Sequence, residues 1–432
     1  MAKFLRVRYL VLFIVCLMYF ITYIDRVNIA VAGPLIRREM NLSPTQLGLI
    51  FSAFAYPYAA MQIVGGLLAD RFGPRLVLAV LSVLWALATL MTGISWGVAG
   101  LVMSRVLLGV GEGGAFPAAT RAFTFWMPVA ERGFAQGITH SFARLGGAVT
   151  PPIVMAIAIW QGWRASFVVL GSVSFVWTVV WLAIFRNSPA EHKWVKASEL
   201  AEIGLPAARA RQDKRAKVPW KLLIKRMWLV TFVDFCYGWS LWVFLTWLPS
   251  YLSDVRGFEL SQMAIVTMLP LTAGVVGDTL GGVATDSILK RTHNIRLARR
   301  TMLVGGLTGS FLFILPAIFT PSPFHAIVYL ALSFFFLELT NAVLWTLPID
   351  IADKFAGTAG GFMNTGFGIA GMISPAVFGF LIQKTGSYML PFFISAGLLL
   401  VGAACSLKID PTRRIDDGRG LGYAESEAKN PI

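Results

Sequence analysis

The sequence predicts an all-α, polytopic membrane protein with twelve transmembrane helices in two pseudo-symmetric six-helix halves. Of its 432 residues, 56% are hydrophobic and only 14% are charged, whereas about a quarter of the residues of a soluble protein are charged. Apolar segments of about 20 residues, the length that crosses a bilayer core, recur along nearly the whole chain. The run Gly66-Leu-Leu-Ala-Asp70 after the second segment returns as Gly282-Val-Ala-Thr-Asp286 after the eighth, which indicates a repeated six-helix unit.

Each apolar segment is long enough to cross the membrane as a helix. The first has a basic start like a secretory signal, but it is too long for one and eleven more follow, so we expect an uncleaved anchor. The predicted spans, in chain order, are 9–32, 47–68, 76–96, 98–120, 133–158, 164–185, 228–252, 262–284, 300–320, 325–349, 357–383 and 387–407.

Polar stretches divide these spans into parts. The only long polar insertion, rich in Lys, Arg and Glu, separates six spans from six and is typical of a linker. The predicted parts are an N-terminal half (1–186), a cytoplasmic linker (187–226), a C-terminal half (227–408) and a disordered cytoplasmic tail (409–432).

The basic residues predict the orientation. With the spans numbered, 29 of the 37 lysines and arginines lie on the side of the N-terminus and five on the other side. Because cytoplasmic loops carry the excess of Lys and Arg, we expect both termini in the cytoplasm. The net charge of +15 is therefore a topology signal, and nucleic acid is not an expected partner.

Several chemistries are excluded by spacing. Cys16, Cys236 and Cys405 are far apart and inside apolar segments, so neither a disulfide framework nor a zinc site is expected. The glycines of Gly109-Val-Gly111-Glu-Gly113-Gly lie inside a span and no Walker lysine follows them, so we expect close helix contact rather than nucleotide binding. No catalytic or metal site is predicted, and the protein is not expected to be an enzyme.

The stretch from Gly66 to Arg75 carries a family resemblance. It reads Gly66-Leu-Leu-Ala-Asp70-Arg71-Phe-Gly73-Pro-Arg75 and resembles the GxxxDRxGRR loop signature of the major facilitator superfamily. The resemblance implies a conformational gate on the side of the N-terminus. We expect its arginines to pair with acids such as Glu131 or Asp350. The implied gate residues are Gly66, Asp70, Arg71, Gly73, Arg75 and, in the second half, Asp286.

Three further motifs resemble one branch of that superfamily, the anion:cation symporters, which include bacterial sugar-acid and aromatic-acid transporters and vesicular glutamate carriers. The resemblance implies that Tyr23 and Asn364 contact the substrate. Tyr237 stands where the glutamate carriers have an arginine, and Arg144 follows the position where galactonate-type members place a glutamine, so neither glutamate nor galactonate itself is indicated. The motifs are Tyr23-Ile-Asp25-Arg26-Val-Asn28, Arg105-Val-Leu-Leu-Gly-Val-Gly-Glu112-Gly-Gly-Ala-Phe-Pro117, and Gly360-Gly-Phe-Met-Asn364 with Ser374-Pro375.

Charged and titratable residues inside the spans are the candidate functional residues, because a charge there costs several kcal/mol unless it is paired or faces water. Arg105 and Glu112 are seven residues apart, so they share a helix face at about 10 Å axial separation. Counting inward from the loops places Glu112, Arg144 and Glu338 near mid-bilayer. The full set is Asp25, Arg26, Arg105, Glu112, His140, Arg144, Asp234, Asp278 and Glu338.

These charges predict anion binding coupled to protons. The forked guanidiniums of Arg26 and Arg144 suit a carboxylate. Uptake of an anion against a negative interior needs a coupled cation, and Asp25 and Glu112 are the predicted proton carriers. The sequence leaves open whether these are permanent ion pairs instead, with Arg105 as the partner of Glu112.

The sequence leaves the roles of the remaining candidates open. Glu338 is predicted either as a third proton site or as the salt-bridge partner of Arg144 across the halves. Tyr23, Tyr237, Trp345 and Asn364 are predicted substrate contacts, with packing as the alternative. The sequence assigns no role to His140, Asp234 or Asp278.

The sequence thus predicts a proton-coupled symporter of the bacterial inner membrane that imports a small organic anion by alternating access. A sugar acid (an aldonate, aldarate or uronate) is the first expected substrate. The alternatives are an aromatic acid, phthalate-like or hydroxybenzoate-like, then drug/proton antiport, then a non-transporting sensor. We expect no cofactor besides the coupling protons, contact with membrane lipid and, as the resemblance implies, a monomer.

Overall fold

The described part of the chain is a bundle of helices. The computed structural model describes residues 6–128, 131–203, 219–352 and 355–415, and these ranges contain no β-strand. They contain twelve helical segments long and apolar enough to cross a membrane. Each overlaps one predicted span, so the all-α, twelve-span prediction is confirmed.

In the first half and the segment after it, the described residues form ten helices, and two of the spans are split into shorter helices. They are α1 (Val7–Met40), α2 (Pro44–Ala53), α3 (Ala55–Phe72), α4 (Pro74–Ile94), α5 (Val98–Gly113), α6 (Ala115–Trp126), α7 (Arg132–Gln161), α8 (Trp163–Ile184), the short 3₁₀ helix η3 (Pro189–Glu191) and α9 (Ala197–Ile203).

The second half contains six unsplit helices. They are α11 (Trp220–Asp254), α12 (Leu260–Thr292), α13 (Ile295–Phe319), α14 (Pro323–Ala352), α15 (Ala356–Thr385) and α16 (Met389–Ser406).

Several helices run past the predicted spans, because helical hydrogen bonding does not stop at the edge of the apolar stretch. α1 continues to Met40, where Asn41 ends it in the left-handed conformation. α12 ends in the same way at His293. α11 begins at Trp220, inside the stretch expected to be linker. Hydropathy marks the hydrocarbon-crossing part of a helix, whereas capping residues determine its ends.

The start of the predicted disordered tail is packed against the second half. Ile409 and Ile415 are buried, and the Ile415 amide donates to the Ile351 carbonyl at 2.7 Å. Arg296 pairs with Asp410 at 2.8 Å. The disorder expected from residue 409 is therefore wrong for 409–415, because two isoleucines anchor an otherwise polar stretch; residues 416–432 lie outside the described ranges.

Glycines permit close helix crossings in the first half. A side chain on Gly65 would overlap the backbone of Gly114, where α5 ends and α6 begins. A side chain on Gly111 would meet Trp85 at 2.6 Å, and one on Gly113 would meet the Tyr58 carbonyl at 2.6 Å. The predicted packing role of this glycine run is confirmed.

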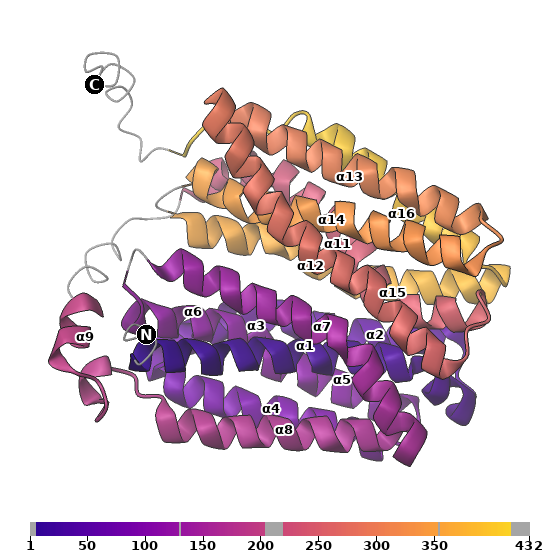
Figure 1. Ribbon diagram of the computed structural model, residues 1–432, viewed down its shortest axis with the longest axis horizontal. Helices are drawn as coiled ribbons and strands as arrows, with labels where there is room; N and C mark the ends of the chain where they lie inside the picture. Colours follow the sequence, from indigo (N-terminus) through magenta and orange to yellow (C-terminus); the bar gives the residue numbers. More distant parts are fainter. Residues whose placement is uncertain (1–5, 129–130, 204–218, 353–354, 416–432) are drawn as a thin grey trace.

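The two halves meet along three seams. α1 packs against α11, α2 against α15 and α7 against α12, so spans two and five of one half meet spans eleven and eight of the other. Figure 1 shows the halves as two neighbouring bundles, the first indigo to magenta and the second orange to yellow. We call the end that carries α9 and the start of α1 the α9 face, and the end that carries the α1–α2 turn the opposite face.

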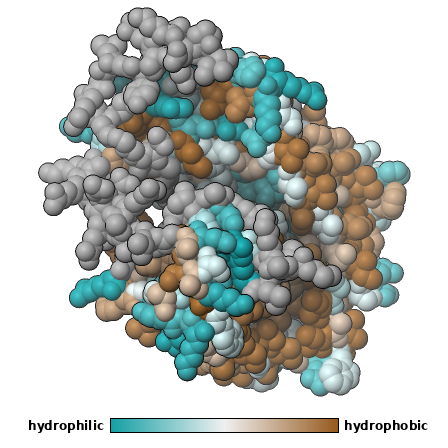
Figure 2. All heavy atoms as spheres, turned by 60° about the vertical axis from the view of Figure 1, so that its left-hand side comes forward, coloured by the Kyte–Doolittle hydropathy of each residue, from teal (hydrophilic) through white to brown (hydrophobic). Residues whose placement is uncertain are grey.

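The outer flanks are apolar. Ile63, Val179 and Ile265 lie in three different spans and expose 69%, 68% and 62% of their surface. Figure 2 turns the α9 face toward the reader, with hydrophilic side chains gathered on it and hydrophobic ones over the flank. A polar end and apolar flanks are what a bilayer requires, and the protein is an integral membrane protein.

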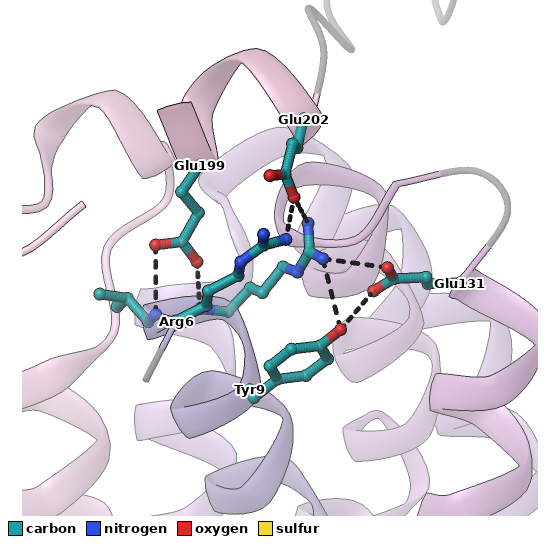
Figure 3. A network of polar contacts seen from close by, with 7 residues as sticks. Arg6, Tyr9, Glu131, Glu199 and Glu202 are labelled. Atoms are coloured by element: carbon teal, nitrogen blue, oxygen red, sulfur yellow. Dashed lines mark hydrogen bonds and ion pairs between the residues drawn. The ribbon is translucent and has the colours of Figure 1, made fainter. Parts of the chain in front are cut away.

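A polar clasp joins α9 to the first half (Figure 3). The buried carboxylate of Glu199 accepts from the amides of Val7 at 3.2 Å and Arg8 at 2.9 Å. These amides open α1 and have no partner within the helix. The buried guanidinium of Arg8 then pairs with Glu131 at 3.0 Å and Glu202 at 3.3 Å. Glu199 therefore acts as the N-terminal cap of a membrane span, supplied from a separate segment.

We expect Glu199→Ala to lower the thermal unfolding midpoint of the detergent-purified protein. The change removes two charge-assisted hydrogen bonds at the positive end of a helix, which are together worth about 1–2 kcal/mol. The matched control is Glu191→Ala, an exposed glutamate in η3, which should leave the midpoint within error of wild type. Equal midpoints for the two variants would contradict the capping role.

Candidate functional site

The first charged pair of the membrane interior joins Arg26 and Glu112. Arg26 lies on α1, and its Nε donates to Glu112 Oε2 at 2.6 Å. Glu112 lies two residues before the break between α5 and α6. Arg26 is 7% exposed and Glu112 is fully buried. Arg26 Nη2 and Glu112 Oε1 have no hydrogen-bond partner among the described residues, so the pair has unused capacity to bind another polar group.

Four aromatic rings surround the Arg26 guanidinium. Its carbon is 4.5 Å from the ring centre of Tyr58 and 5.0–5.2 Å from those of Tyr23, Phe54 and Phe116. Each such contact favours the cation by about 0.5–2 kcal/mol. The sequence identified Tyr23 but missed the other three, because an aromatic residue in an apolar span has no distinguishing signal.

Arg105 does not form the ion pair with Glu112 that its spacing allowed. Its guanidinium carbon packs 4.8 Å from the ring centre of Phe54, and the partner of Glu112 is Arg26. The reason is axial distance: seven residues separate Arg105 and Glu112 by about 10 Å, whereas Arg26 reaches Glu112 sideways from a neighbouring helix. Arg105 still acts on Glu112 and Asp25 through longer-range electrostatics.

Asp25 is a buried carboxylate, and no arginine of the described ranges lies within ion-pair distance of it. Its Oδ2 accepts from the Ser174 hydroxyl on α8 at 3.4 Å, and its Oδ1 has no partner within these ranges. Asp25 is 2% exposed. A buried carboxylate held only by a long hydroxyl contact is suited to binding a proton.

The second charged pair bridges the two halves. Arg144 Nη2 on α7 lies 3.1 Å from Glu338 Oε2 on α14. The Tyr237 hydroxyl on α11 lies 3.4 Å from the same Arg144 nitrogen and donates to Glu338 Oε2 at 3.2 Å. Glu338 is fully buried. Of the two alternatives for Glu338, the structure shows the salt bridge.

Two predicted substrate contacts lie outside these pairs. Trp345 on α14 is 42% exposed, and its ring centre lies 6.1 Å from that of His140 on α7. Asn364 on α15 is half-buried, and no hydrogen bond within the described ranges joins it to the charged pairs.

The unassigned titratable residues have local partners. Asp234 accepts from the Phe367 amide at 3.2 Å, and Asp278 accepts from the Asn341 amide at 2.9 Å. His140 packs edge-on against Tyr19 with ring centres 5.6 Å apart.

The predicted gate of the first half is docked to α8. Gly73 adopts a φ of +83°, which favours glycine. The Arg75 amide donates to Asn187 Oδ1 at 3.0 Å, and its guanidinium donates to the Leu182 carbonyl at 2.7 Å. Gly66 lies on α3 facing Pro117, and Arg71 is exposed. The side chain of Asp70 lies outside the described residues.

The expected acids of the gate bind other arginines. Glu131 pairs with Arg8, and Asp350 pairs with Arg299 at 2.8 Å. The expectation that the first-half gate arginines bind them is wrong, because α1 and α13 bring basic residues closer. Asp286, the second-half counterpart, also faces Arg299, at 3.9 Å.

Further polar contacts between the halves lie toward the opposite face. Arg37 pairs with Asp254, whose carboxylate also accepts from the Tyr388 hydroxyl at 3.0 Å. The Ala376 amide donates to Ser52 Oγ at 3.1 Å, across the α2–α15 seam. A longer contact, from the Thr45 amide to Gln383 Oε1 at 3.4 Å, also joins the halves here. The conformation is therefore held closed at the opposite face.

We expect Asp254→Asn to shift the protein toward states open at the opposite face. The change removes the ion pair with Arg37, worth about 0.2–1 kcal/mol at an exposed position, so the ratio of open to closed molecules should rise by up to about fivefold. Spin labels at Thr45 and Lys384, in a cysteine-free background, would report the added long-distance population. The control Glu259→Gln, an exposed carboxylate on the same face, should leave the distribution unchanged; a matching shift in the control would rule out the latch.

The chain is similar to a known protein family and to proteins named as transporters. The sequence model of the Major Facilitator Superfamily matches residues 15–375. The chain is 64% identical to a Cupriavidus necator protein named "Probable sulfoacetate transporter", over 95% of this chain and 96% of that one. It is 34% identical to the "Hexuronate transporter" of Bacillus subtilis, over 95% of each chain.

Solved structures share the fold. A bacterial homologue of the human lysosomal transporter Spinster, in an inward-facing and occupied conformation, superposes with a TM-score of 0.75 at 20% identity, covering 95% of this chain and 98% of that one. A D-xylose–proton symporter gives a TM-score of 0.75 at 15% identity, covering 93% and 98%. At these identities the likeness concerns the fold alone.

Proposed function

Because the chain belongs to the Major Facilitator Superfamily and is an organic-anion transporter rather than an enzyme, we propose that it is a proton-coupled symporter that imports a small organic anion. The observation that carries the proposal is a pair of guanidiniums inside the spans, the buried Arg26 and the partly buried Arg144, each neutralised by a buried carboxylate. Such pairs bind an anion when the carboxylate takes up a proton, because the arginine is then released to the substrate.

Coupling to protons also follows from the energetics of uptake. Moving one negative charge into a cell with a negative interior costs about 2.3 kcal/mol per 100 mV. Glu112 is the first coupling site, because its protonation frees Arg26 directly. Asp25 is the second, because it is buried and lacks an arginine partner within the described residues. Loss of these protons on the inner side would restore the ion pair and expel the anion.

Sulfoacetate is the first candidate substrate, because the relative that carries this name is 64% identical over nearly the whole chain. A sugar acid is the second candidate, since relatives named for hexuronate and D-galactonate transport are 34% and 32% identical. Both are anions that the two arginines suit. Tyr23, Tyr237, Trp345 and Asn364 remain proposed substrate contacts.

The proposed setting is the bacterial inner membrane with both termini in the cytoplasm, because Lys and Arg gather on the side of the N-terminus. The α9 face is then cytoplasmic, and the contacts at the opposite face close the protein toward the outside. Transport proceeds by rocking of the two halves, and the predicted gate residues regulate opening of the α9 face. We propose that the protein acts as a lipid-embedded monomer.

The test is uptake of labelled sulfoacetate by proteoliposomes with an acidic exterior. We expect accumulation that a protonophore abolishes, while exchange against internal unlabelled sulfoacetate survives. Accumulation that persists with the protonophore present would exclude proton coupling. A parallel thermal-shift screen with sulfoacetate, sugar acids, aromatic acids and cationic drugs would rank the classes, because a ligand stabilises by mass action. Stabilisation by cations alone would overturn the anion assignment.

A further inference from the structure

The pair formed by Arg144 and Glu338 differs from the Arg26–Glu112 pair in its connections. Arg26 and Glu112 both belong to the first half, whereas Glu338 reaches Arg144 from the second half. Tyr237, also from the second half, contacts both members. Glu338 Oε1 has no hydrogen-bond partner among the described residues although the side chain is fully buried. The membrane interior therefore contains a second guanidinium whose charge is neutralised by a partner that moves with the other half.

The two guanidiniums lie near the same ring, that of Tyr23. The Arg26 carbon is 5.0 Å from the ring centre of Tyr23, and the Arg144 carbon is 5.9 Å from the same point. The two carbons are therefore no farther apart than those two distances combined. A guanidinium carbon lies about 4 Å from the central atom of an acid group that it binds, and two acid centres joined by one carbon are about 2.6 Å apart. A short diacid is therefore long enough to reach both arginines anywhere within that upper limit.

We infer that the substrate is a short dianion whose two acid groups bind Arg26 and Arg144, and that Glu338 takes up a proton when Arg144 passes to the substrate. This inference rests on the proposed function and deepens it by naming the substrate class. No covalent bond changes: one carboxylate gains a proton, and the substrate's acid group replaces it on the guanidinium.

The charges of the two ion pairs indicate that one proton is taken up for each acid group of the substrate. When all four groups are ionised, Arg26 balances Glu112 and Arg144 balances Glu338, so each pair is neutral. Each acid group added to this buried centre leaves one uncompensated negative charge, and a proton removes it at lowest cost. A dianion therefore needs one proton more than a monoanion.

The groups that face Glu338 are few. Arg144 and Tyr237 contact it directly, and Asp278 on α12 acts on it at longer range. Asp278 is partly exposed and already accepts from Asn341. His140 lies near Arg144 on α7 and acts on Glu338 only through it. Glu338 is therefore the carboxylate best placed to exchange with the second acid group.

The test compares sulfoacetate with isethionate, the two-carbon sulfonate in which a hydroxymethyl group replaces the carboxylate. We expect wild type to bind sulfoacetate at least tenfold more tightly, and to take up one more proton per sulfoacetate than per isethionate in weakly buffered detergent solution. Arg144→Gln should reduce this preference to less than threefold with isethionate affinity retained. Glu338→Gln should lose the extra proton.

Matched controls separate folding from recognition. Arg38→Gln, at an exposed arginine on α1, should keep the full preference, and Arg144→Lys should restore part of it. Equal wild-type affinity for the two ligands, or an unchanged preference in a folded Arg144→Gln variant, would overturn the inference and leave proton-coupled anion uptake standing. Absence of proton-driven uptake of either ligand would instead reject the proposed function.

Discussion

Replacing Glu112 with glutamine is expected to abolish concentrative uptake while leaving exchange nearly intact. Glutamine retains an oxygen that accepts from Arg26 Nε, so the local packing survives, but it cannot bind or release a proton. The variant then resembles the protonated protein, which binds the anion at any pH. In proteoliposomes we expect accumulation driven by a proton gradient to fall at least tenfold, and counterflow exchange to stay within about threefold of wild type.

The matched control for this variant is Glu259→Gln. Glu259 is an exposed carboxylate at the start of α12, and its neutralisation should leave both accumulation and exchange at wild-type levels. Concentrative uptake at the wild-type level by Glu112→Gln would remove Glu112 from the coupling mechanism. Loss of exchange as well would assign it to anion binding instead.

Replacing Arg26 with lysine is expected to weaken anion binding at least tenfold, although the positive charge is kept. Lysine lacks the planar fork that donates two parallel hydrogen bonds to an acid group. Lysine also loses part of the contact with the four surrounding rings, because the planar guanidinium stacks on aromatic rings and an ammonium group does not. Tenfold corresponds to about 1.4 kcal/mol. Calorimetric titration with sulfoacetate would measure the effect.

Arg26→Ala is expected to lower the stability of the protein as well as its affinity for the anion. It leaves Glu112 buried without its partner, which costs about 3–5 kcal/mol, so we expect lower thermal stability as well as lost binding. Arg38→Lys, at an exposed arginine on the same helix, should change neither. Wild-type affinity in Arg26→Lys would mean that point charge alone recognises the anion and that the fork has no role.

The sequence contained enough information to predict the spans and the intramembrane charges, because both follow from the composition of short windows. It placed Glu112, Arg144 and Glu338 near mid-bilayer by counting residues from the loops. It also predicted the close helix contacts of Gly111 and Gly113. The spans and the depths of the charges depend on one helix and the bilayer, so no knowledge of neighbouring helices is needed for them.

The partners of these charges could not be predicted in the same way. That Arg26 rather than Arg105 holds Glu112 depends on how α1 packs beside α5. That Arg8 binds Glu202 depends on α9, a short helix within a stretch that composition marks as linker. The aromatic surround of Arg26 comes from three separate spans. Pairing is a property of inter-helix geometry, and a single sequence does not encode it in any local pattern.

The neutrality of each of the two ion pairs also determines how strongly the carrier can concentrate its substrate. A centre without net charge lets the empty carrier reset without an electrical penalty. If a dianion enters with two protons, the substrate-bound carrier also moves no net charge across the membrane. The ratio of internal to external substrate then depends on the pH difference alone. One pH unit is worth about 1.4 kcal/mol per proton, so two protons permit about a hundredfold accumulation. A cell with such a carrier would scavenge best from acidic surroundings, whatever the voltage across its membrane.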